Sequence, residues 1–314
     1  MSWIRQSAHD SLYKAYERLL TREVTEGPMP RHVAIIQDGN RRYADKIGEP
    51  RFNGHIYGAL TTERVLAWCL DLGIKHTTLY TFSTENAGRS NEELSALFAL
   101  LQDRFDALSS DEKIHKHQVR VRMIGERGLI PDNVLKSIER AEYATRHFKS
   151  SSLNFAVAYG GRKEIVDVVQ GIARRVEANA LSVEDIDEQL LKQHFYNNNA
   201  LEDVDLIIRS GGEERVSNFL PWQASGNECC SYFCAPYWPE FRRIDLLRAI
   251  RTFQEREWQK RVNTVQRVFR FLNEVGRVEI EEVFRLSRRA CMITYEEVND
   301  ILRDTSFSLT PSND

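Results

Sequence analysis

The feature that most constrains the fold of this chain is a regular alternation of short apolar runs with amphipathic segments. The apolar runs are rich in β-branched and aromatic residues and span residues 32–37, 76–82, 119–124, 153–158, 204–208 and, more weakly, 231–234. Such alternation is typical of an α/β domain. Because the run at 153–158 is apolar almost throughout, it is expected to be buried on both faces. We therefore predict a mainly parallel central sheet of about six strands flanked by helices.

The clearest helix is predicted for residues 90–105. Ser90 followed by Glu93 forms a capping box. After it, apolar residues recur at steps of three and four, which gives one buried stripe: Leu94, Leu97, Phe98, Leu101 and Phe105. The segments 57–72 and 163–177 show the same spacing, so they are also predicted to be helices.

Two helical extensions are expected outside this core. Residues 3–20 have amphipathic spacing and are followed by the breaker sequence EGPMP, and residues 262–303 also have a helical pattern. The chain is accordingly divided into an N-terminal helix (1–27), a single main domain (28–260) and a C-terminal helical extension (261–314). The first helix could lie on a membrane surface, but packing against the domain is the preferred interpretation because its basic excess is small.

Charge and hydropathy exclude several function classes. The 43 Lys and Arg residues are balanced by 46 Asp and Glu residues, a net charge of -3 that argues against nucleic acid as a partner. No apolar run approaches the length of about 18 residues that a membrane span needs. The five Cys residues lack paired C-x-x-C spacing, so buried thiols in a protein of the reducing cytoplasm are expected. Because the chain has no overall basic excess, any anionic ligand must bind at a local cluster of Arg residues.

Polar loops directly follow four of the predicted strands. They are DGNRR at 38–42, STENAGR at 83–89, YGGR at 159–162 and RSGGEERVSN at 209–218. In parallel sheets, ligands gather in the loops at the carboxyl ends of the strands. These four loops are therefore the candidate functional segments.

The first loop has the chemistry of a polyanion site. It carries a carboxylate, a glycine and an amide, then two guanidinium groups, with a further Arg and a His close behind: Asp38, Gly39, Asn40, Arg41, Arg42, Arg51 and His55. Glycine permits close backbone approach, and Arg offers a planar fork that suits phosphate oxygens. Asp38 has two interpretations, a counter-ion for the Arg residues or a Mg²⁺ ligand, since Mg²⁺ is commonly held by one or two carboxylates plus substrate phosphates.

The loop at 209–218 repeats this logic with Arg209, two glycines, Glu213, Arg215 and Ser217. Two separate cationic clusters suggest two phosphorylated substrates held side by side. Neither loop has the spacing of a P-loop or of a dinucleotide fingerprint, so ATP and NAD are not indicated. The chain also lacks a G-x-S-x-G nucleophile elbow.

Five motifs in fixed order resemble those of a known family. HVAIIQDGNRR, RFNGH, TLYTFSTEN with Arg89, LNFAVAYGGR and DLIIRSGGEERVSNFLPWQ closely resemble the cis-prenyltransferases, the undecaprenyl diphosphate synthase family, over residues 28–260. The resemblance implies a Mg²⁺-dependent enzyme, usually a homodimer, that condenses isopentenyl diphosphate with an allylic prenyl diphosphate. Its product would be a Z-configured polyprenyl diphosphate, a lipid whose release suggests peripheral contact with a membrane.

The same resemblance implies roles for individual residues. Asp38 would position Mg²⁺ on the allylic diphosphate. The allylic diphosphate would also be held by the rest of the first cluster, Gly39, Asn40, Arg41, Arg42, Arg51 and His55, and Arg89 is a further substrate-binding candidate. Arg209, Arg215 and Ser217 would hold isopentenyl diphosphate, and Ser83 and Asn86 would lie near the reacting carbons. The proton-accepting base stays open between a carboxylate, His55 and isopentenyl diphosphate itself.

The chain also departs from the family pattern. Ala87 follows Asn86 where the family usually has an aromatic residue, and Arg41 stands where many members have Gly. A second metal ligand of the family corresponds to Glu228 when counted from Trp222, but to Cys230 when counted back from the next motif; Glu228 is the prediction. Two other functions stay open: an enzyme that joins prenyl diphosphates in an unusual orientation or uses another acceptor, and a non-catalytic partner subunit.

Overall fold

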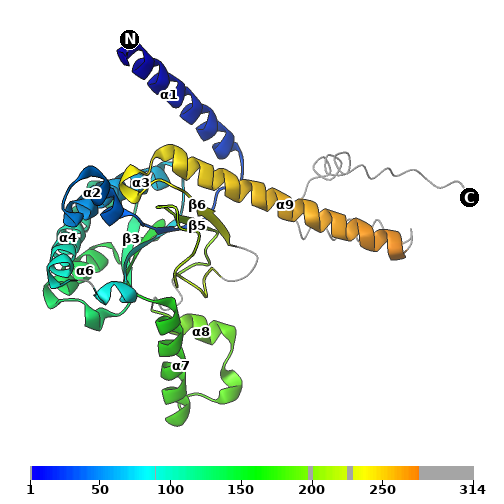
Figure 1. The fold of residues 1–314 in the computed structure, drawn as a ribbon. Coiled ribbons are helices and arrows are strands. Elements are labelled where there is room, and N and C mark those ends of the chain that lie inside the picture. The colour runs from blue at the N-terminus through cyan, green and yellow to red at the C-terminus, as the bar shows by residue number, and fades with distance from the viewer. Residues whose placement is uncertain (1, 89, 197–200, 225–228, 276–314) are drawn as a thin grey trace, which may run out of the picture. The chain divides into compact units, whose positions relative to one another are not determined.

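The computed structural model describes residues 2–88, 90–196, 201–224 and 229–275. Its centre is a six-stranded, entirely parallel sheet with the strand order β3-β4-β2-β1-β5-β6 (Figure 1). The strands are β1 His32–Ile36, β2 His76–Ser83, β3 Val119–Ile124, β4 Ser151–Tyr159, β5 Leu206–Arg209 and β6 Cys230–Phe233. The predicted fold class is confirmed, and the weak apolar run at 231–234 does form a strand.

Helices connect and cover these strands. They are α1 Ser2–Glu26, α2 Asn40–Ile47, α3 Arg51–Asp71, α4 Asn91–Ser110, α5 Glu112–Lys116, α6 Asp132–Thr145, α7 Gly161–Glu177, α8 Glu188–His194 and α9 Arg243–Val275. Short 3₁₀ turns lie at Thr84–Gly88, Arg127–Leu129, Val183–Asp185 and Trp238–Glu240. The compact unit built on the sheet runs to Phe253. Of the predicted C-terminal helix at 262–303, the part beyond residue 275 lies outside the described residues.

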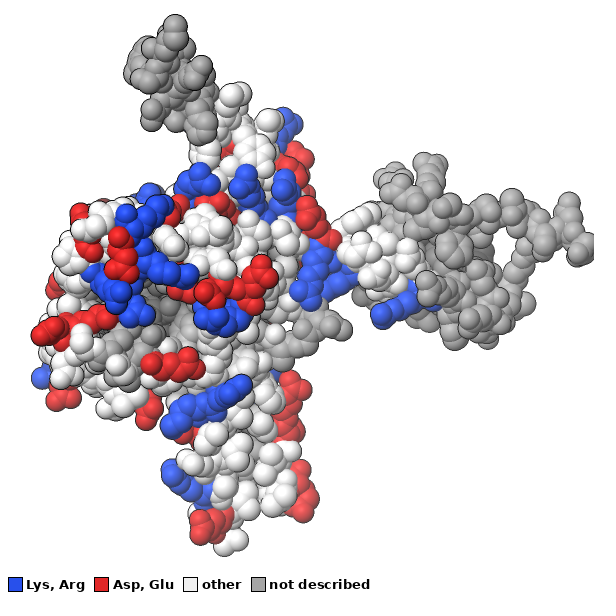
Figure 2. Space-filling model, viewed as in Figure 1, with Lys and Arg blue, Asp and Glu red and all other residues white. Residues whose placement is uncertain are grey.

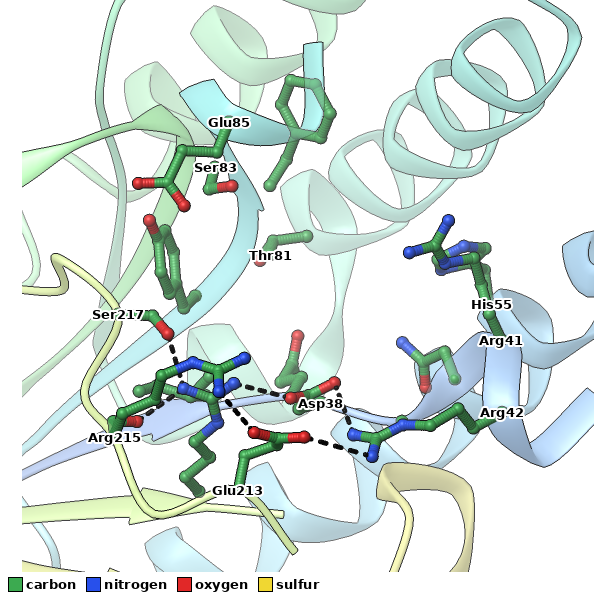
Figure 3. Close-up of a pocket in the computed structure, with 17 residues that line it drawn as sticks. Asp38, Arg41, Arg42, His55, Thr81, Ser83, Glu85, Glu213, Arg215 and Ser217 are labelled. Atoms are coloured by element: carbon green, nitrogen blue, oxygen red, sulfur yellow. Dashed lines mark hydrogen bonds and ion pairs between the residues drawn. The ribbon is translucent and has the colours of Figure 1, made fainter. Parts of the chain in front are cut away.

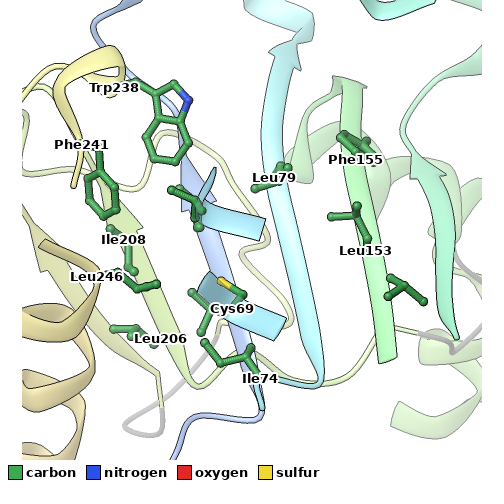
Figure 4. Packing of buried hydrophobic residues seen from close by; sticks show 14 of the residues in the cluster. Cys69, Ile74, Leu79, Leu153, Phe155, Leu206, Ile208, Trp238, Phe241 and Leu246 are labelled. Carbon is green, nitrogen blue, oxygen red and sulfur yellow. The ribbon is translucent and has the colours of Figure 1, made fainter. Parts of the chain in front are cut away.

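One face of the sheet carries the main hydrophobic core. Figure 4 shows Leu79, Leu206 and Ile208 from the strands on the face that also receives Cys69 of α3 and Leu246 of α9. The second half of α3, together with α4, α6 and α1, adds further side chains to this cluster. The opposite face is covered by a second cluster, in which Tyr80 stacks on Phe219 at 4.5 Å between ring centroids. The core thus fixes the strand ends from both sides.

The amphipathic helix predicted around residues 90–105 is confirmed as α4. The Ser90 hydroxyl caps the helix by accepting a hydrogen bond from the Glu93 backbone N–H at 3.3 Å. Leu97, Leu101 and Phe105 are buried in the core. The cap matters for the site because it holds Glu93 in the first turn of α4.

The first helix is partly buried against the domain. Among its described side chains, Leu20 and Val24 are buried in the hydrophobic cluster and Tyr13 packs against it, whereas Leu12 and Leu19 are 72% and 68% exposed. The amphipathic spacing of residues 3–20 therefore does not by itself indicate which side chains are covered.

The cysteines of the described ranges are free and buried: Cys69, Cys229, Cys230 and Cys234. Burial raises the pKa of the Cys69 thiol and of the Cys234 thiol to about 12. These thiols are therefore protonated and act as small core side chains, as the sequence predicted. In the part of the chain that was described, no helix has the combined length and apolarity required to cross a bilayer.

Candidate active site

A cavity of about 450 Å³ lies at the carboxyl ends of β1, β2 and β5, where the polar loops were predicted to meet (Figure 3). It is lined by Ile36, Gln37, Asp38, Gly39, Asn40, Arg41, Arg42, His55, Tyr80, Thr81, Phe82, Ser83, Glu85, Arg209, Glu213, Arg215 and Ser217. The two cationic clusters therefore share one cavity, even though their loops are far apart in sequence.

Asp38 joins the two clusters directly. Its Oδ2 accepts a hydrogen bond from Arg209 Nη2 at 2.7 Å, and its Oδ1 lies 3.1 Å from Arg42 Nη2. Asp38 follows β1 and Arg209 ends β5, and these strands are neighbours, with Ile36 opposite Arg209. The sheet register thus places one carboxylate between two guanidinium groups, one from each cluster.

Arg209 is the buried centre of the loop at 209–218. Its side chain is 5% exposed, and Nη1 donates to the Arg215 backbone carbonyl at 2.5 Å and to Ser217 Oγ at 2.6 Å. These bonds fold the loop around the guanidinium group. The buried Nε has no hydrogen-bond partner among the residues that the structure describes. Because a buried donor without a partner is costly, this position suits a ligand oxygen or a water molecule.

The backbone of the first loop is fixed by the segment that follows β6. The Asp38 carbonyl accepts hydrogen bonds from the Trp238 N–H at 2.9 Å and from Ser210 Oγ at 2.8 Å. Gly39 has φ +100°, and a Cβ there would lie 2.7 Å from Tyr237 Cδ1. The loop therefore needs a glycine at this position, both for its left-handed backbone and for the close contact. No side chain caps the N-terminus of α2, so its first N–H groups are available to an anion.

Arg41 and His55 occupy the other side of the cavity and share one carboxylate. His55 Nε2 lies 3.4 Å from Glu93 Oε1, and Arg41 Nη1 lies 3.9 Å from Glu93 Oε2. Figure 3 shows Arg41 and His55 side by side, across the cavity from Ser217. Glu93 belongs to the capping box of α4, so the predicted helix start also orients two of the predicted site residues.

Of the predicted site residues whose side chains are described, Arg51 is not brought to this cavity. It lies at the start of α3, is paired with Asp45 at 3.1 Å and has a side chain that is 60% exposed. Ser83, at the end of β2, lines the cavity. Arg89 and Glu228 lie outside the described residues, and so do the side chains of Asn86 and Ala87.

Several lining residues were missed by sequence reasoning. Glu85 adds a carboxylate, and Tyr80 and Phe82 add an aromatic wall. Glu213 was named as part of its loop but was given no role there. The Tyr80 hydroxyl donates to the Tyr159 carbonyl at 3.2 Å, and burial raises the pKa of Tyr80 well above its ordinary value. The Tyr80 phenol is therefore uncharged. The alternation of side chains along β2 gives no sign of which residues face a ligand, because both faces of this strand are covered.

Basic side chains converge in the cavity, whereas on the face drawn in Figure 2 they are mixed with acidic ones. On the face drawn in Figure 2, Lys and Arg side chains lie among Asp and Glu side chains, without one continuous basic area. Inside the cavity, by contrast, Arg41, Arg42, Arg209 and Arg215 converge with His55. A net charge of -3 thus coexists with a cavity suited to a polyanion.

Comparison with known proteins identifies the family. The family model for undecaprenyl diphosphate synthases matches residues 36–300. The chain belongs to this family. As a member of the undecaprenyl diphosphate synthase family it is a prenyltransferase that makes polyprenyl diphosphates, which confirms the function predicted from the five motifs. Both cationic clusters lie within the matched range, and all of their charged side chains except Arg51 line the cavity just described.

Similar proteins agree with this assignment. A tritrans,polycis-undecaprenyl-diphosphate synthase (geranylgeranyl-diphosphate specific) of Methanosarcina mazei is 47% identical over 271 residues, which cover 85% of this chain and 91% of that protein. A synthase of the same name from Methanopyrus kandleri is 51% identical over 257 residues, covering 81% and 94%. Among solved structures, lavandulyl diphosphate synthase from Lavandula x intermedia, in complex with dimethylallyl diphosphate, matches with a TM-score of 0.67 and 34% identity, covering 74% and 96%.

Proposed function

We propose that this prenyltransferase uses geranylgeranyl diphosphate as its allylic substrate and extends it with isopentenyl diphosphate to a polyprenyl diphosphate with Z-configured new double bonds. Relatives at 43–51% identity share the name of a geranylgeranyl-diphosphate-specific synthase. The observation that carries the proposal is the single cavity in which two cationic clusters meet on Asp38. One reaction that needs two diphosphates side by side is the condensation of these two substrates.

The roles of the residues follow from their positions. The first-loop cluster, with the uncapped N-terminus of α2, Arg41, Arg42 and His55, would hold the allylic diphosphate. Arg209, Arg215 and Ser217 would hold isopentenyl diphosphate. When the allylic carbon–oxygen bond breaks, negative charge grows on the departing diphosphate, and preorganised guanidinium groups stabilise that charge. The isopentenyl double bond then attacks the allylic carbon, and loss of one proton sets the new double bond.

The donor set fits Mg²⁺ as part of an enzyme–substrate complex. Across the described ranges, no group of three or more His, Cys, Asp or Glu side chains could hold a metal ion by itself. Mg²⁺ does not require such a group, since it commonly binds one or two carboxylates together with substrate phosphates and water. Asp38, at 28% exposure on the cavity wall, would be that carboxylate. Bound there, Mg²⁺ would neutralise charge on the departing diphosphate.

A homodimer in the cytoplasm, with its lipid product released to a nearby membrane, completes the proposal. The exposed Val166 and Val169 of α7, at 49% and 55% exposure, are apolar side chains that a second copy of the chain would cover. Sedimentation of the purified chain would give the oligomeric state, and a monomer at micromolar concentration would contradict this part.

A second candidate is the joining of two allylic diphosphates in an unusual orientation. The likeness to lavandulyl diphosphate synthase at 34% identity favours it, together with Ala87 at a position where the family usually has an aromatic residue. This candidate needs the same cavity and the same cationic clusters. It differs in whether isopentenyl diphosphate is consumed. The third function weighed from the sequence, a non-catalytic partner subunit, is not favoured because Asp38, Arg42, Arg209 and Arg215 are all in place.

The test is a primer series with product analysis. Purified protein, Mg²⁺ and labelled isopentenyl diphosphate are incubated with allylic diphosphates of five to twenty-five carbons, and chain length and double-bond geometry are determined. We expect the twenty-carbon primer to be used best, and to give labelled products with Z bonds that the Asp38→Ala variant does not make. Unlabelled products containing two allylic units would support the second candidate. Absence of product with every primer would contradict both.

A further inference from the structure

Glu213 lies between the two cationic clusters and pairs with one arginine of each. Its Oε1 is 3.7 Å from Arg42 Nη1, and its Oε2 accepts a hydrogen bond from Arg215 Nη1 at 2.5 Å. Figure 3 shows Glu213 bridging these two guanidinium groups below Asp38. Arg42 belongs to the proposed allylic site and Arg215 to the proposed isopentenyl site. The Glu213 carboxylate therefore neutralises the guanidinium groups that the two diphosphates would need.

The side chain of Glu213 can leave this position without movement of its loop. The preceding glycines are anchored to the segment after β6, with the Gly211 N–H 2.7 Å from the Pro236 carbonyl and the Gly212 N–H 2.9 Å from the Cys234 carbonyl. Both glycines have positive φ, +88° and +76°. The Glu213 side chain is 35% exposed and its partner Arg215 is 64% exposed. A rotamer change into solvent is thus open to Glu213, and an exposed ion pair is cheap to break.

We propose that Glu213 is a displaceable counter-ion that occupies the anion position between the clusters when no diphosphate is bound and returns when one leaves. A diphosphate, with its larger charge, displaces the carboxylate from Arg42 and Arg215. Once the diphosphate begins to depart, the carboxylate competes for the same guanidinium groups. Glu213 thereby lowers the affinity for diphosphate and speeds its release.

Competition by Glu213 for the guanidinium groups assists repeated elongation, an argument that rests on the proposed function. After each condensation, inorganic diphosphate must leave the allylic site, and the lengthened product must move its own diphosphate from the Arg209–Arg215 cluster to the Arg42 cluster. A carboxylate that pairs with both clusters weakens the hold of each at the moment of transfer. Too tight a grip would slow the cycle, because release of product often limits such enzymes.

The chain offers a matched control next to Glu213. Glu214 is exposed and does not line the cavity, so Glu214→Gln removes the same charge one residue away. Glu213→Asp keeps the charge but shortens the reach. None of the three residue changes removes a buried group, so all three variants are expected to fold. Thermal unfolding of each would verify this.

The experiment measures binding of inorganic diphosphate by calorimetry without Mg²⁺, so that no turnover is required. We expect Glu213→Gln to bind it at least about tenfold more tightly than the wild type, since about 1.4 kcal/mol of competing interaction corresponds to a factor of ten. Glu214→Gln should match the wild type, and Glu213→Asp should fall between the two. Equal or weaker binding by Glu213→Gln would overturn the proposal and would indicate that Glu213 only holds the arginines in place.

Steady-state kinetics provides the second readout. With Glu213→Gln, KM for isopentenyl diphosphate should fall, kcat should fall with it, and inhibition by inorganic diphosphate should strengthen by about the same factor as binding. If the wild type binds inorganic diphosphate but forms no polyprenyl product, the proposed function fails and the binding comparison still tests the counter-ion. If the wild type is active and the three variants behave alike, only the role of Glu213 is wrong.

Discussion

The guanidinium group of Arg209 donates to the carboxylate of Asp38 at 2.7 Å, across 171 residues of sequence. This contact joins the loops after β1 and β5, and Arg42 binds the other oxygen of the same carboxylate at 3.1 Å. Asp38 therefore joins the two cationic clusters, and in the proposed function it is also the carboxylate that would hold Mg²⁺. The two interpretations that the sequence left open, counter-ion and metal ligand, are compatible in this geometry.

Replacing Asp38 should affect both the stability of the fold and the rate of prenyl transfer. In Asp38→Asn the amide keeps one hydrogen-bond acceptor but loses the charge that faces the buried Arg209. We expect the variant to lose about 1–3 kcal/mol of unfolding free energy, the cost of a weakened bond to a buried charged group. Prenyl transfer should fall by at least about a hundredfold, because charge stabilisation at the departing diphosphate is typically worth that much.

Urea unfolding and the initial rate of product formation measure the two effects. The control is Ser182→Ala, a change at an exposed residue in a loop that does not line the cavity. Wild-type activity in Asp38→Asn would contradict the assignment of the cavity as the active site.

Gly211 should tolerate no side chain. Its φ of +88° is unfavourable for other residues, and an added Cβ would lie 2.7 Å from Arg42 Nη2. Gly211→Ala is expected to cost about 1–2 kcal/mol of stability from the backbone conformation, and to displace the Arg42 guanidinium from Asp38. KM for the allylic diphosphate should rise more than KM for isopentenyl diphosphate. Gly171→Ala, in α7 with open space around it, is the control; equal KM changes for both substrates would argue against the effect on Arg42.

A buried histidine makes the stability of the fold depend on pH. His32 is fully buried, with Nδ1 2.8 Å from the Glu202 carbonyl and Nε2 2.8 Å from Thr78 Oγ1. Nδ1 therefore carries the proton of a neutral ring, and Nε2 accepts from the threonine hydroxyl. Burial lowers the pKa of His32 from 6.5 to about 4. Burial lowers the pKa of the neighbouring His76 as well.

The sign of the pH effect follows from these directions. Between about pH 6.5 and pH 4 the unfolded chain binds more protons at His32 than the folded chain, so the unfolding free energy falls as the pH falls. The contribution of neutral His32 to the unfolding free energy is fully present above about pH 6.5. Below that pH it falls by about 1.4 kcal/mol per pH unit, so the loss reaches about 3 kcal/mol at about pH 4. Urea unfolding of wild type and His32→Gln from pH 7.5 to pH 4 measures it. The variant should show a flatter profile, and parallel profiles would contradict the assignment.

The capping box at the start of α4 should couple stability to the site. Ser90→Ala removes the acceptor for the Glu93 N–H, which costs about 1 kcal/mol of unfolding free energy. Because Glu93 also faces His55 and Arg41, fraying of this turn should raise KM for the allylic diphosphate. Ser90→Asp, which restores the cap, should recover stability. A stability loss without any change in KM would show that the orientation of Glu93 does not depend on the cap.

The sequence predicted the elements of this fold because their signals are local. The stripe of Leu97, Leu101 and Phe105 and the cap at Ser90 depend on residues within a few turns of one another. The strand ends were equally visible, since polar loops follow apolar runs directly. The position of Asp38 at such a strand end could therefore be predicted, and so could the presence of arginines in the same loop.

Contacts between distant segments were not predictable in the same way. The pairing of Asp38 with Arg209 depends on β1 and β5 being neighbours in the sheet, and no local sequence pattern predicts the strand order. Arg51 is a further example, since its motif suggests a ligand-binding residue and local patterns do not show that it pairs with Asp45 on the surface. The bridging position of Glu213 likewise arises only when the two loops meet. For α1, the helical periodicity is clear, but the sequence does not show which of its side chains pack against the core.

The central claim is that one cavity holds two diphosphates, one on each cationic cluster. A crystal structure of the protein with Mg²⁺, isopentenyl diphosphate and a non-reactive thio analogue of geranylgeranyl diphosphate tests it most directly. The account predicts an allylic diphosphate at the N-terminus of α2 beside Asp38 and Arg42, and an isopentenyl diphosphate on Arg209, Arg215 and Ser217. A single diphosphate spanning both clusters at saturating concentrations of both ligands, or binding of either ligand elsewhere, would contradict it.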